Sequence, residues 1–592
     1  MPCTYTSYVD NSACHFNPLE DELIKAEGKL YCIFHLPETG KKRLTSLALD
    51  EFDKEIHQYA DESLGTVNFE GTIFVKPVDF SGYDFGDKSV SFARAHFVDG
   101  DVDFQNATFG CGDINFSNAK FGKGIVRFNG VIFGKGKVTF WGIQVEECDF
   151  YFNFARFGEG EVSFAHAKFG KGKYVSFRNT NFGNGNVSFQ SANFGSCHAG
   201  FWQSKFGDGK VDFSHACFGD ENSVGFHEVK FGNGDVNFSF IKAVGKHGAG
   251  FSDCVFGNGK VNFTGAEFGD GGVRFCDAIF GNGDVCFKDV VFSGGDILFT
   301  QAKFGEGLIN FDRAKFGIGL LNFRGANFGH GDISFRSSEF NGPVFFTKIE
   351  VINGNIDFSI PKSLKQDWTE VDFSGVSFKK NVTFENRVFF QAANFTNCAF
   401  DQAPNFHGCV LHEGTDFTDA IFNSTDYRHA SYYRRLKLQM AQIMDKESHR
   451  NFFALEQKCR RNNPNSSRLD RSLSWSYQLS SDFGQNTSRP IYCILGLAII
   501  GCFLFFAVGL LNQIYMSASV NPPEIIIDSV NFTFQQTVKP LSIWNLKDNV
   551  YLSEFSGFRL LLVRLLSVFY SILQVSFVAL FLLSLRWRLK SS

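Results

Sequence analysis

The sequence has little methionine, little net charge and no secretory signal at its start. Only 4 Met occur among 592 residues, and the formal net charge is −5. So small a charge on so long a chain points to no particular class of partner. The 15 cysteines are scattered singly. With no signal sequence, this scatter predicts reduced thiols in a cytosolic domain and argues against a disulfide framework.

Motifs of catalysis and of nucleotide binding are also missing. No Ser-His-Asp or Cys-His arrangement has a distinctive spacing. The many Gly-x-Gly sequences recur at a fixed period and lack the strand–loop–helix context that a phosphate-binding loop requires. We therefore expect a protein that is not an enzyme.

Phenylalanine and glycine, by contrast, are abundant, with 76 and 59 residues. From Phe92 to Phe335, phenylalanines recur at a nearly constant step of about 12 residues. A second phenylalanine follows nearly all of them within the same unit, from Phe97 to Phe340. The consensus unit is V-x-F-x-x-A-x-F-G-x-G-x, which fits neither a helix nor a plain strand. Stacked repeats would pile these rings into one continuous core. The expected core positions include Phe104, Phe109, Phe116, Phe121, Phe263, Phe268, Phe275 and Phe280.

The A-x-F triplets of this repeat resemble the A-(D/N)-(L/F) core of pentapeptide-repeat proteins. The resemblance implies a mainly β fold, a right-handed quadrilateral β-helix in which the small and large residues point inwards. One unit of about 12 residues would form half a coil, and two units one four-sided coil. The inserted Gly-x-Gly departs from the usual five-residue side. We expect glycine there because a tight corner requires either a positive φ or a close backbone approach.

Two apolar runs near the C-terminus, Ile491–Leu511 and Leu565–Leu585, are each long enough to span a bilayer as a helix of about 31 Å. Basic residues precede the first run and follow the second. The positive-inside rule therefore predicts a two-span protein of the inner (cytoplasmic) membrane with both termini cytoplasmic. The flanking sequences SWSYQLSSDFGQNTSRP and LFLLSLRWRLK resemble those of bacterial membrane-anchored pentapeptide-repeat proteins. In the second run, Ser571 and Gln574 can share one helix face.

These features divide the chain into four regions. Residues 1–66 form an N-terminal cap with a helical segment, and residues 67–425 form the Phe-rich β-helix. Residues 426–488 form a basic juxtamembrane region that reads as helical, with a break near Asp445. Residues 489–592 hold the two spans, with an external loop at about 513–557.

The cap contains the strongest candidate site, formed by Cys3, Cys14, Cys32 and His35. Three thiols and one imidazole, closed by a C-x-x-H pair, suit a tetrahedral Zn²⁺ site. Four protein ligands would leave no open position, so such a zinc would be structural. Two alternatives stay open at this point: His15 could replace His35, or the three cysteines could be unrelated buried thiols.

The sequence supports three functions to different degrees. The first is a non-catalytic, membrane-anchored solenoid that acts as a protein-interaction scaffold or sensor on the cytoplasmic side, in contact with membrane lipids and an unknown protein partner. The alternative is an oligomeric membrane effector or pore, a homo-oligomer gated by the repeat domain. A DNA-mimic inhibitor of a topoisomerase is less favoured, because acidic and basic residues intersperse along the repeat; we do not expect nucleic acid as a partner.

Overall fold

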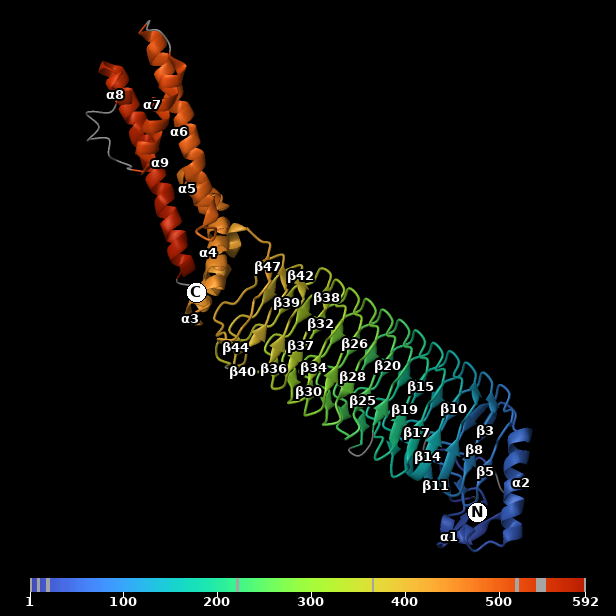
Figure 1. Cartoon of the computed structure of the whole chain (residues 1–592). Helices are drawn as coiled ribbons and strands as arrows, with labels where there is room; N and C mark the ends of the chain where they lie inside the picture. Colours follow the sequence, from blue (N-terminus) through green and yellow to red (C-terminus); the bar gives the residue numbers. More distant parts are fainter. Residues whose placement is uncertain are drawn as a thin grey trace. The chain divides into compact units, whose positions relative to one another are not determined.

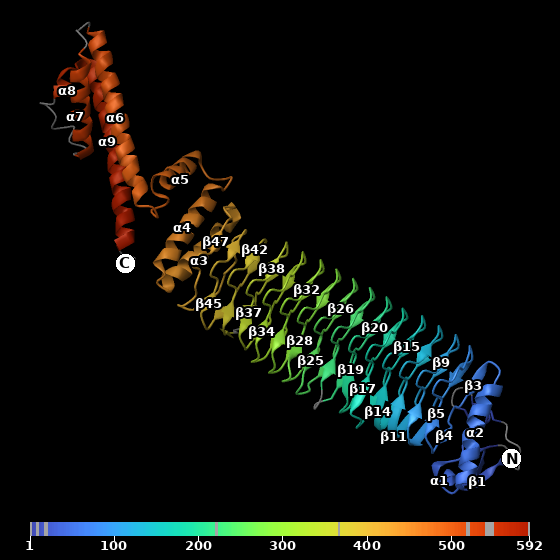
Figure 2. The same cartoon turned by 45° about the vertical axis from the view of Figure 1, so that its right-hand side comes forward.

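The computed structural model divides the chain into two compact units, Met1–Asn423 and Ser424–Ser592. Figures 1 and 2 show the two units from two directions. Each unit is described by itself below. The structure describes residues 3–7, 11–16, 22–219, 223–364, 367–516, 521–538 and 550–589.

The first unit is a parallel β-solenoid, in which each coil contributes four short sides. In one coil these are β26 (Val261–Asn262), β27 (Glu267–Phe268), β28 (Val273–Arg274) and a bridge at Ile279. Val261 pairs with Val285, which holds the same position two repeat units further along the chain. The two-unit, four-sided coil expected from the repeat is therefore the coil that forms.

One side of the solenoid shows the stacking most clearly, as a sheet of 14 parallel strands (Figure 1). Its strands are β3 (Thr66–Asn68), β6 (Ser89–Ser91), β10 (Ile114–Asn115), β13 (Val138–Thr139), β15 (Val162–Ser163), β18 (Val187–Ser188), β20 (Val211–Asp212), β23 (Val236–Asn237), β26, β29 (Val285–Cys286), β32 (Ile309–Asn310), β35 (Ile333–Ser334), β39 (Ile356–Asp357) and β43 (Val382–Thr383). A valine or isoleucine of each strand points into the core and is almost fully buried.

Phenylalanine rings fill the interior in ordered columns. Phe263 stacks on Phe287 of the next coil with the ring centroids 4.8 Å apart, and it meets Phe275 of its own coil edge to face at 5.5 Å. Stacked and edge-to-face contacts both add to the large area that each ring buries. All eight phenylalanines named from the repeat are buried, each with at most 2% of its surface exposed.

Two different backbone features form the tight corners of the coils. The residue before the small inward residue has a positive φ in coil after coil, as at Asn106 and Asp253, both with φ 57°. Asn and Asp tolerate this left-handed conformation better than most residues do. Gly259, from a Gly-x-Gly, lacks a positive φ, but a Cβ atom there would lie only 2.1 Å from the Gly234 carbonyl oxygen. Close backbone approach thus explains this Gly-x-Gly.

Near its C-terminal end the solenoid encloses a buried arginine. Arg387 stands at the inward position where alanine is the commonest residue of the repeat, and only 1% of it is exposed. Its guanidinium donates hydrogen bonds to the carbonyl oxygens of Phe358, Ser338 and Phe335 and lies 5.4 Å from the Trp368 ring. Burial lowers the pKa of Arg387 to about 9. The arginine thus joins successive coils from the inside.

The N-terminal cap consists of β1 (Ile24–Ala26), β2 (Lys29–Tyr31), α1 (Glu38–Lys41) and α2 (Ser46–Glu62). The strands β1 and β2 pair antiparallel. The side chain of Thr45 accepts a hydrogen bond from the Ala48 amide and so caps α2. The buried face of α2 packs on the first coil, where Phe52 lies 6.3 Å from Phe74 (Figure 2). Helix α2 therefore shields the end of the β-stack from solvent.

The second unit is helical. Its elements are η2 (Tyr427–His429), α3 (Ala430–Gln442), α4 (Lys446–Arg461), α5 (Arg468–Ser481), α6 (Ser488–Tyr515), α7 (Pro522–Val538), α8 (Val550–Ser553) and α9 (Gly557–Leu589). The predicted break near Asp445 is confirmed, because Asp445 accepts hydrogen bonds from the Glu447 and Ser448 amides and caps α4. The buried Glu456 carboxylate joins α4 to α3 through Arg434 and Lys437.

Two helices of this unit, α6 and α9, are long and apolar enough to cross a membrane. The segment between them, expected to be an external loop, contains α7 and α8, which the sequence analysis did not predict. Both helices share one buried apolar cluster with α6 and α9, formed by Phe505, Phe532, Tyr551, Leu552, Phe555, Val563 and Tyr570.

Candidate metal centre

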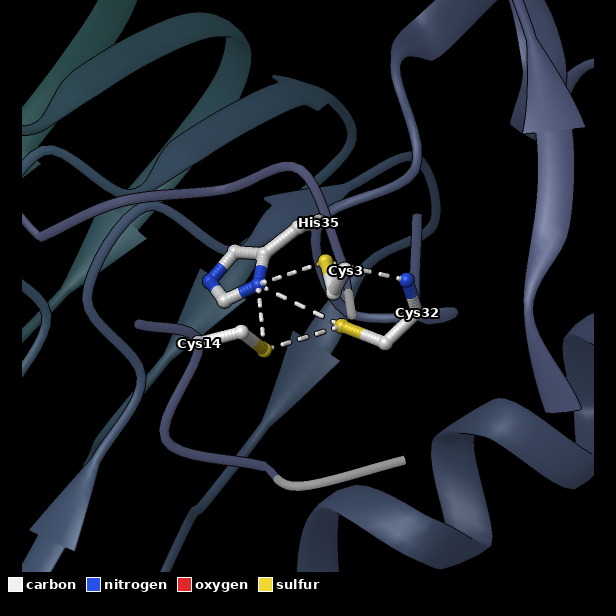
Figure 3. Close-up of side chains that lie close together, drawn as sticks. All are labelled: Cys3, Cys14, Cys32 and His35. Atoms are coloured by element: carbon white, nitrogen blue, oxygen red, sulfur yellow. Dashed lines mark hydrogen bonds between the residues drawn. The ribbon is translucent and has the colours of Figure 1, made fainter. Parts of the chain in front are cut away.

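The structure brings Cys3, Cys14, Cys32 and His35 together in the cap (Figure 3). Cys14 directly follows Ala13, whose bridge to Thr6 closes the N-terminal loop. Cys32 directly follows β2, and the His35 amide donates to the Cys32 carbonyl oxygen, which turns both side chains toward the same point. All four residues are buried, and their ligand atoms lie within 4.8 Å of one another.

The distances between these atoms match those of a metal site. The Cys14 and Cys32 sulfurs are 3.6 Å apart, and each lies 3.3 Å from His35 Nδ1. The Cys3 sulfur is 4.0 Å from the same nitrogen. Tetrahedral Zn²⁺ with ordinary bond lengths would hold its ligands about 3.8 Å apart for two sulfurs and about 3.6 Å apart for sulfur and nitrogen. The cluster could therefore hold a metal ion with little rearrangement.

The surroundings orient the ligands. His35 Nε2 lies 2.9 Å from the Glu70 carbonyl oxygen, which can accept a hydrogen bond only if Nε2 carries the proton. That tautomer leaves the Nδ1 lone pair directed at the three sulfurs. The Cys32 amide donates to the Cys3 sulfur at 3.2 Å. Partners of this kind fix ring orientation and ligand basicity around bound metals.

The thiols affect one another strongly. Hydrogen bonds from Cys14 and Cys32 lower the pKa of Cys3, whereas the interaction with Cys3 raises the pKa of Cys14 to about 11. Burial lowers the pKa of nearby Lys41 to about 7, an effect that the charge of Cys32 partly opposes. Without a cation, three adjacent thiolates would repel one another. A divalent metal removes that repulsion, because it binds all three as thiolates.

The cluster also ties the cap to the first coil. Tyr5 stacks on the His35 ring at 3.7 Å, and the Ile73 amide donates to the Phe34 carbonyl oxygen. The Ser7 hydroxyl donates to the Glu70 carboxylate at 3.0 Å. A metal here would therefore fix the N-terminal loop onto the open end of the solenoid.

Of the two histidines considered for the fourth ligand, only His35 belongs to the cluster. His15 Nε2 instead lies 2.6 Å from the Asn68 carbonyl oxygen. Because four protein ligands close a tetrahedral site, the arrangement suits a structural ion better than a catalytic one.

Several remaining cysteines have a role that the sequence analysis missed. Cys254, Cys398 and Cys409 occupy the small inward position of the repeat, and their thiols point to the carbonyl oxygens of Phe226, Phe373 and Phe384 in the preceding coil. Burial raises the pKa of Cys398 and of Cys409 to about 12. These thiols are protonated, buried structural groups. Their position in the repeat, two residues before the second large residue, is the signal that could have identified them.

The polar residues of the second apolar run do not pair with each other. The Ser571 hydroxyl donates to Gln536 Oε1 at 2.9 Å, and Gln574 Nε2 donates to the Tyr570 hydroxyl at 2.9 Å. Gln536 belongs to α7. Ser571 thus meets a helix that the sequence analysis placed in a loop, whereas Gln574 bonds to a residue of its own helix, α9.

Fold and site together define a repeat β-solenoid that carries a buried Cys/His cluster at its N-terminal end and two apolar helices in a separate C-terminal unit. No protein-family model matches the chain, and no curated protein matches it either. The regular phenylalanine spacing is consistent with a pentapeptide repeat.

Proposed function

We propose that the chain is a membrane-anchored solenoid of the bacterial pentapeptide-repeat kind, which acts without catalysis as a protein-interaction scaffold or sensor. The observation that carries the proposal is the joining of a long, regular β-solenoid to two apolar helices of bilayer length. A stack of identical coils offers extended rigid faces, which repeat proteins commonly use to bind partners.

Charge supports an inner-membrane topology with both termini in the cytoplasm. Arg489 lies at the start of α6 and Arg586 near the end of α9. Both helices therefore carry a basic residue at the end that we assign to the cytoplasmic side of the membrane. Membrane fractionation tests the anchor. The full chain should resist extraction by carbonate, and a chain ending at Asn423 should be soluble. A full chain that carbonate releases would contradict the proposal.

We further propose that the cluster of Cys3, Cys14, Cys32 and His35 binds Zn²⁺ as a structural ion. The supporting facts are the three-sulfur, one-nitrogen donor set and the hydrogen-bonded His35 ring. The ion would hold the cap in place over the first coil. It would take no part in any reaction.

Partner binding is tested by cross-linking the full chain in its native membrane. One protein that is captured reproducibly, and lost when exposed residues of one solenoid face are replaced, would support the scaffold. Cross-links that yield only lipid or copies of the chain itself would favour the second candidate, an oligomeric effector or pore. That candidate is supported by the polar contacts of α7 with α9.

The DNA-mimic alternative has less support. Oppositely charged residues of neighbouring coils stack on one another, as in the pairs Lys137–Glu161 and Arg313–Asp289. Such pairs interrupt the continuous acidic face that a duplex mimic requires. Inhibition of gyrase supercoiling by the purified chain would revive this alternative.

A further inference from the structure

Two neighbouring cavities lie beside the last turns of α9, the second of the two apolar helices. The smaller has a volume of about 290 Å³ and is lined by residues of α3, α4, α5 and α9. The larger, of about 540 Å³, lies between the end of α9 and the junction of α3 with α4. His449 lines both cavities, so they lie next to each other in the helical unit.

The smaller cavity has an apolar wall. Leu580 and Leu583 line it from α9, and both belong to the last turns of the apolar run Leu565–Leu585. Phe453 of α4 and Phe483, just after α5, also line this cavity. Although it is apolar, Leu583 keeps 47% of its surface exposed. If α9 spans the bilayer, these leucines lie where the hydrocarbon core of the membrane ends.

The larger cavity is basic. Arg586 follows Leu583 by three residues, so it lies on the same face of α9, about one turn closer to the end of the helix. Lys446 and His449 line the cavity from α4. Among the described residues that line either cavity, Asp445 is the only acidic one, and its carboxylate caps α4. Basic side chains therefore lie directly beyond the apolar wall.

Two arginines are placed to contact an anion. Arg586 is exposed and has no ion-pair partner among the residues that the structure describes. Arg450 is half-buried, and its Nε donates to the Lys446 carbonyl oxygen at 3.3 Å, which holds the guanidinium beside the smaller cavity. Lys437 also lines that cavity, but the buried Glu456 carboxylate binds it at 2.6 Å and offsets its charge. We therefore expect an anion to bind at the two arginines.

We propose that the two cavities bind one anionic phospholipid, with its phosphate near Arg450 and Arg586 and an acyl chain along Leu580 and Leu583. Charge complementarity favours an anionic headgroup, because basic pockets at the ends of spanning helices bind such headgroups. The apolar wall favours a lipid over a soluble phosphate compound, because exposed leucine is stabilised by covering it with hydrocarbon. The proposal rests on the membrane anchoring proposed above, and it names the class of lipid that the anchor selects.

The test uses the full chain purified in a nonionic detergent. Native mass spectrometry measures the binding of added dioleoylphosphatidylglycerol, which is anionic, and of dioleoylphosphatidylcholine, which has no net charge. We expect one phosphatidylglycerol to bind at least about tenfold more tightly than phosphatidylcholine. The double variant Arg450→Gln, Arg586→Gln should reduce this preference to about twofold or less. As a matched control, Arg435→Gln, Arg468→Gln removes the same charge from exposed residues that line neither cavity, and it should keep the preference.

Two further measurements distinguish a lipid from a soluble phosphate compound. Leu583→Gln should weaken phosphatidylglycerol binding about fivefold, because the acyl chain then meets a polar side chain. Glycerol 3-phosphate, the soluble counterpart of the headgroup, should not displace the lipid when the two are present at equal concentration. Displacement, or binding that is unchanged in Leu583→Gln, would overturn the assignment of a lipid.

Carbonate extraction of the native membranes separates this proposal from the anchor. An integrated chain that binds both lipids equally, or that keeps its preference in Arg450→Gln, Arg586→Gln, would overturn the lipid site and leave the anchor intact. An equal loss in the control variant would show that binding follows total charge, and it would also overturn the site. A chain that carbonate extracts would remove the anchor and this proposal with it. Gel filtration checks folding, and Arg586→Gln alone, at an exposed position, provides the test if the double variant does not fold.

Discussion

The Gly259→Ala substitution tests whether the Gly-x-Gly sequences need glycine because the backbones of neighbouring coils lie very close together there. The added methyl carbon would lie 2.1 Å from the Gly234 carbonyl oxygen and 2.4 Å from its carbon. To remove this clash, the coil that contains Gly259 and the coil that contains Gly234 would have to separate by about 1 Å. That movement would stretch the hydrogen bond from the Val236 amide to the Lys260 carbonyl oxygen from 2.8 Å beyond bonding distance. Overpacking and the lost bond together should destabilise the coil by about 2–4 kcal/mol.

Hydrogen exchange on the purified full chain in detergent measures this local effect. The Val236 amide of β23 should exchange roughly 30 to 700 times faster in the variant, the range that corresponds to about 2–4 kcal/mol. Gly375→Ala is the control, since Gly375 has φ 72° but no atom within 4 Å of an added Cβ. Its cost should be about 1–2 kcal/mol, from the left-handed backbone alone. A Gly259 variant that is no less stable than the Gly375 variant would refute the close-approach argument.

The remaining predictions concern the metal, the buried arginine and the helical unit. Metal analysis of the purified chain should find about one zinc per chain, and Cys32→Ser should lose most of it; a folded wild-type chain without zinc would contradict the assignment. Arg387→Leu should destabilise the solenoid by about 2–4 kcal/mol in thermal unfolding, because buried carbonyl groups lose charged donors; an unchanged melting temperature would be inconsistent with that role. Burial raises the pKa of Glu456, but hydrogen bonds from Lys437 and Arg434 outweigh it and the net pKa is lowered. The stabilisation is therefore present above the ordinary carboxyl pKa of about 4 and is lost as the pH falls below it. Glu456→Gln should remove this acid sensitivity from the unfolding of α3 and α4, and a variant that retains it would show that another carboxyl is responsible.

The repeat could be predicted well because each coil requires the same kind of residue at the same positions. Phe104 and Phe116 hold the same position in successive units because every unit consists of two sides with their corners. Val261 pairs with Val285 because two such units complete one coil. Arg387 could not be predicted. A cation in the small inward position is tolerable only because carbonyl oxygens of two preceding coils, those of Phe358 in one and of Phe335 and Ser338 in the other, converge on it. That convergence is a property of the stack, and no single unit of sequence contains it.

The four residues of the candidate metal centre, His35 included, could be predicted from the sequence, but the sequence left open whether His15 replaces His35. The C-x-x-H pair favours His35, yet His15 carries the same imidazole and lies next to Cys14. The choice depends on the Glu70 carbonyl oxygen, which orients His35, and on the Asn68 carbonyl oxygen, which binds His15. Both oxygens belong to the first coil, so the selection exists only once the cap is packed on the solenoid.

The sequence by itself determined the coil length, the inward phenylalanines, the two apolar helices and the thiol-rich cap, because each depends on local spacing or on the length of an apolar run. The tertiary structure alone decided that the segment after α6 turns back as α7 with one face toward Ser571. A 17-residue helix of mixed polarity gives no clear signal in a hydropathy profile. Its place is set by Gly501 and Gly509, whose missing side chains matter only where a second helix lies against them.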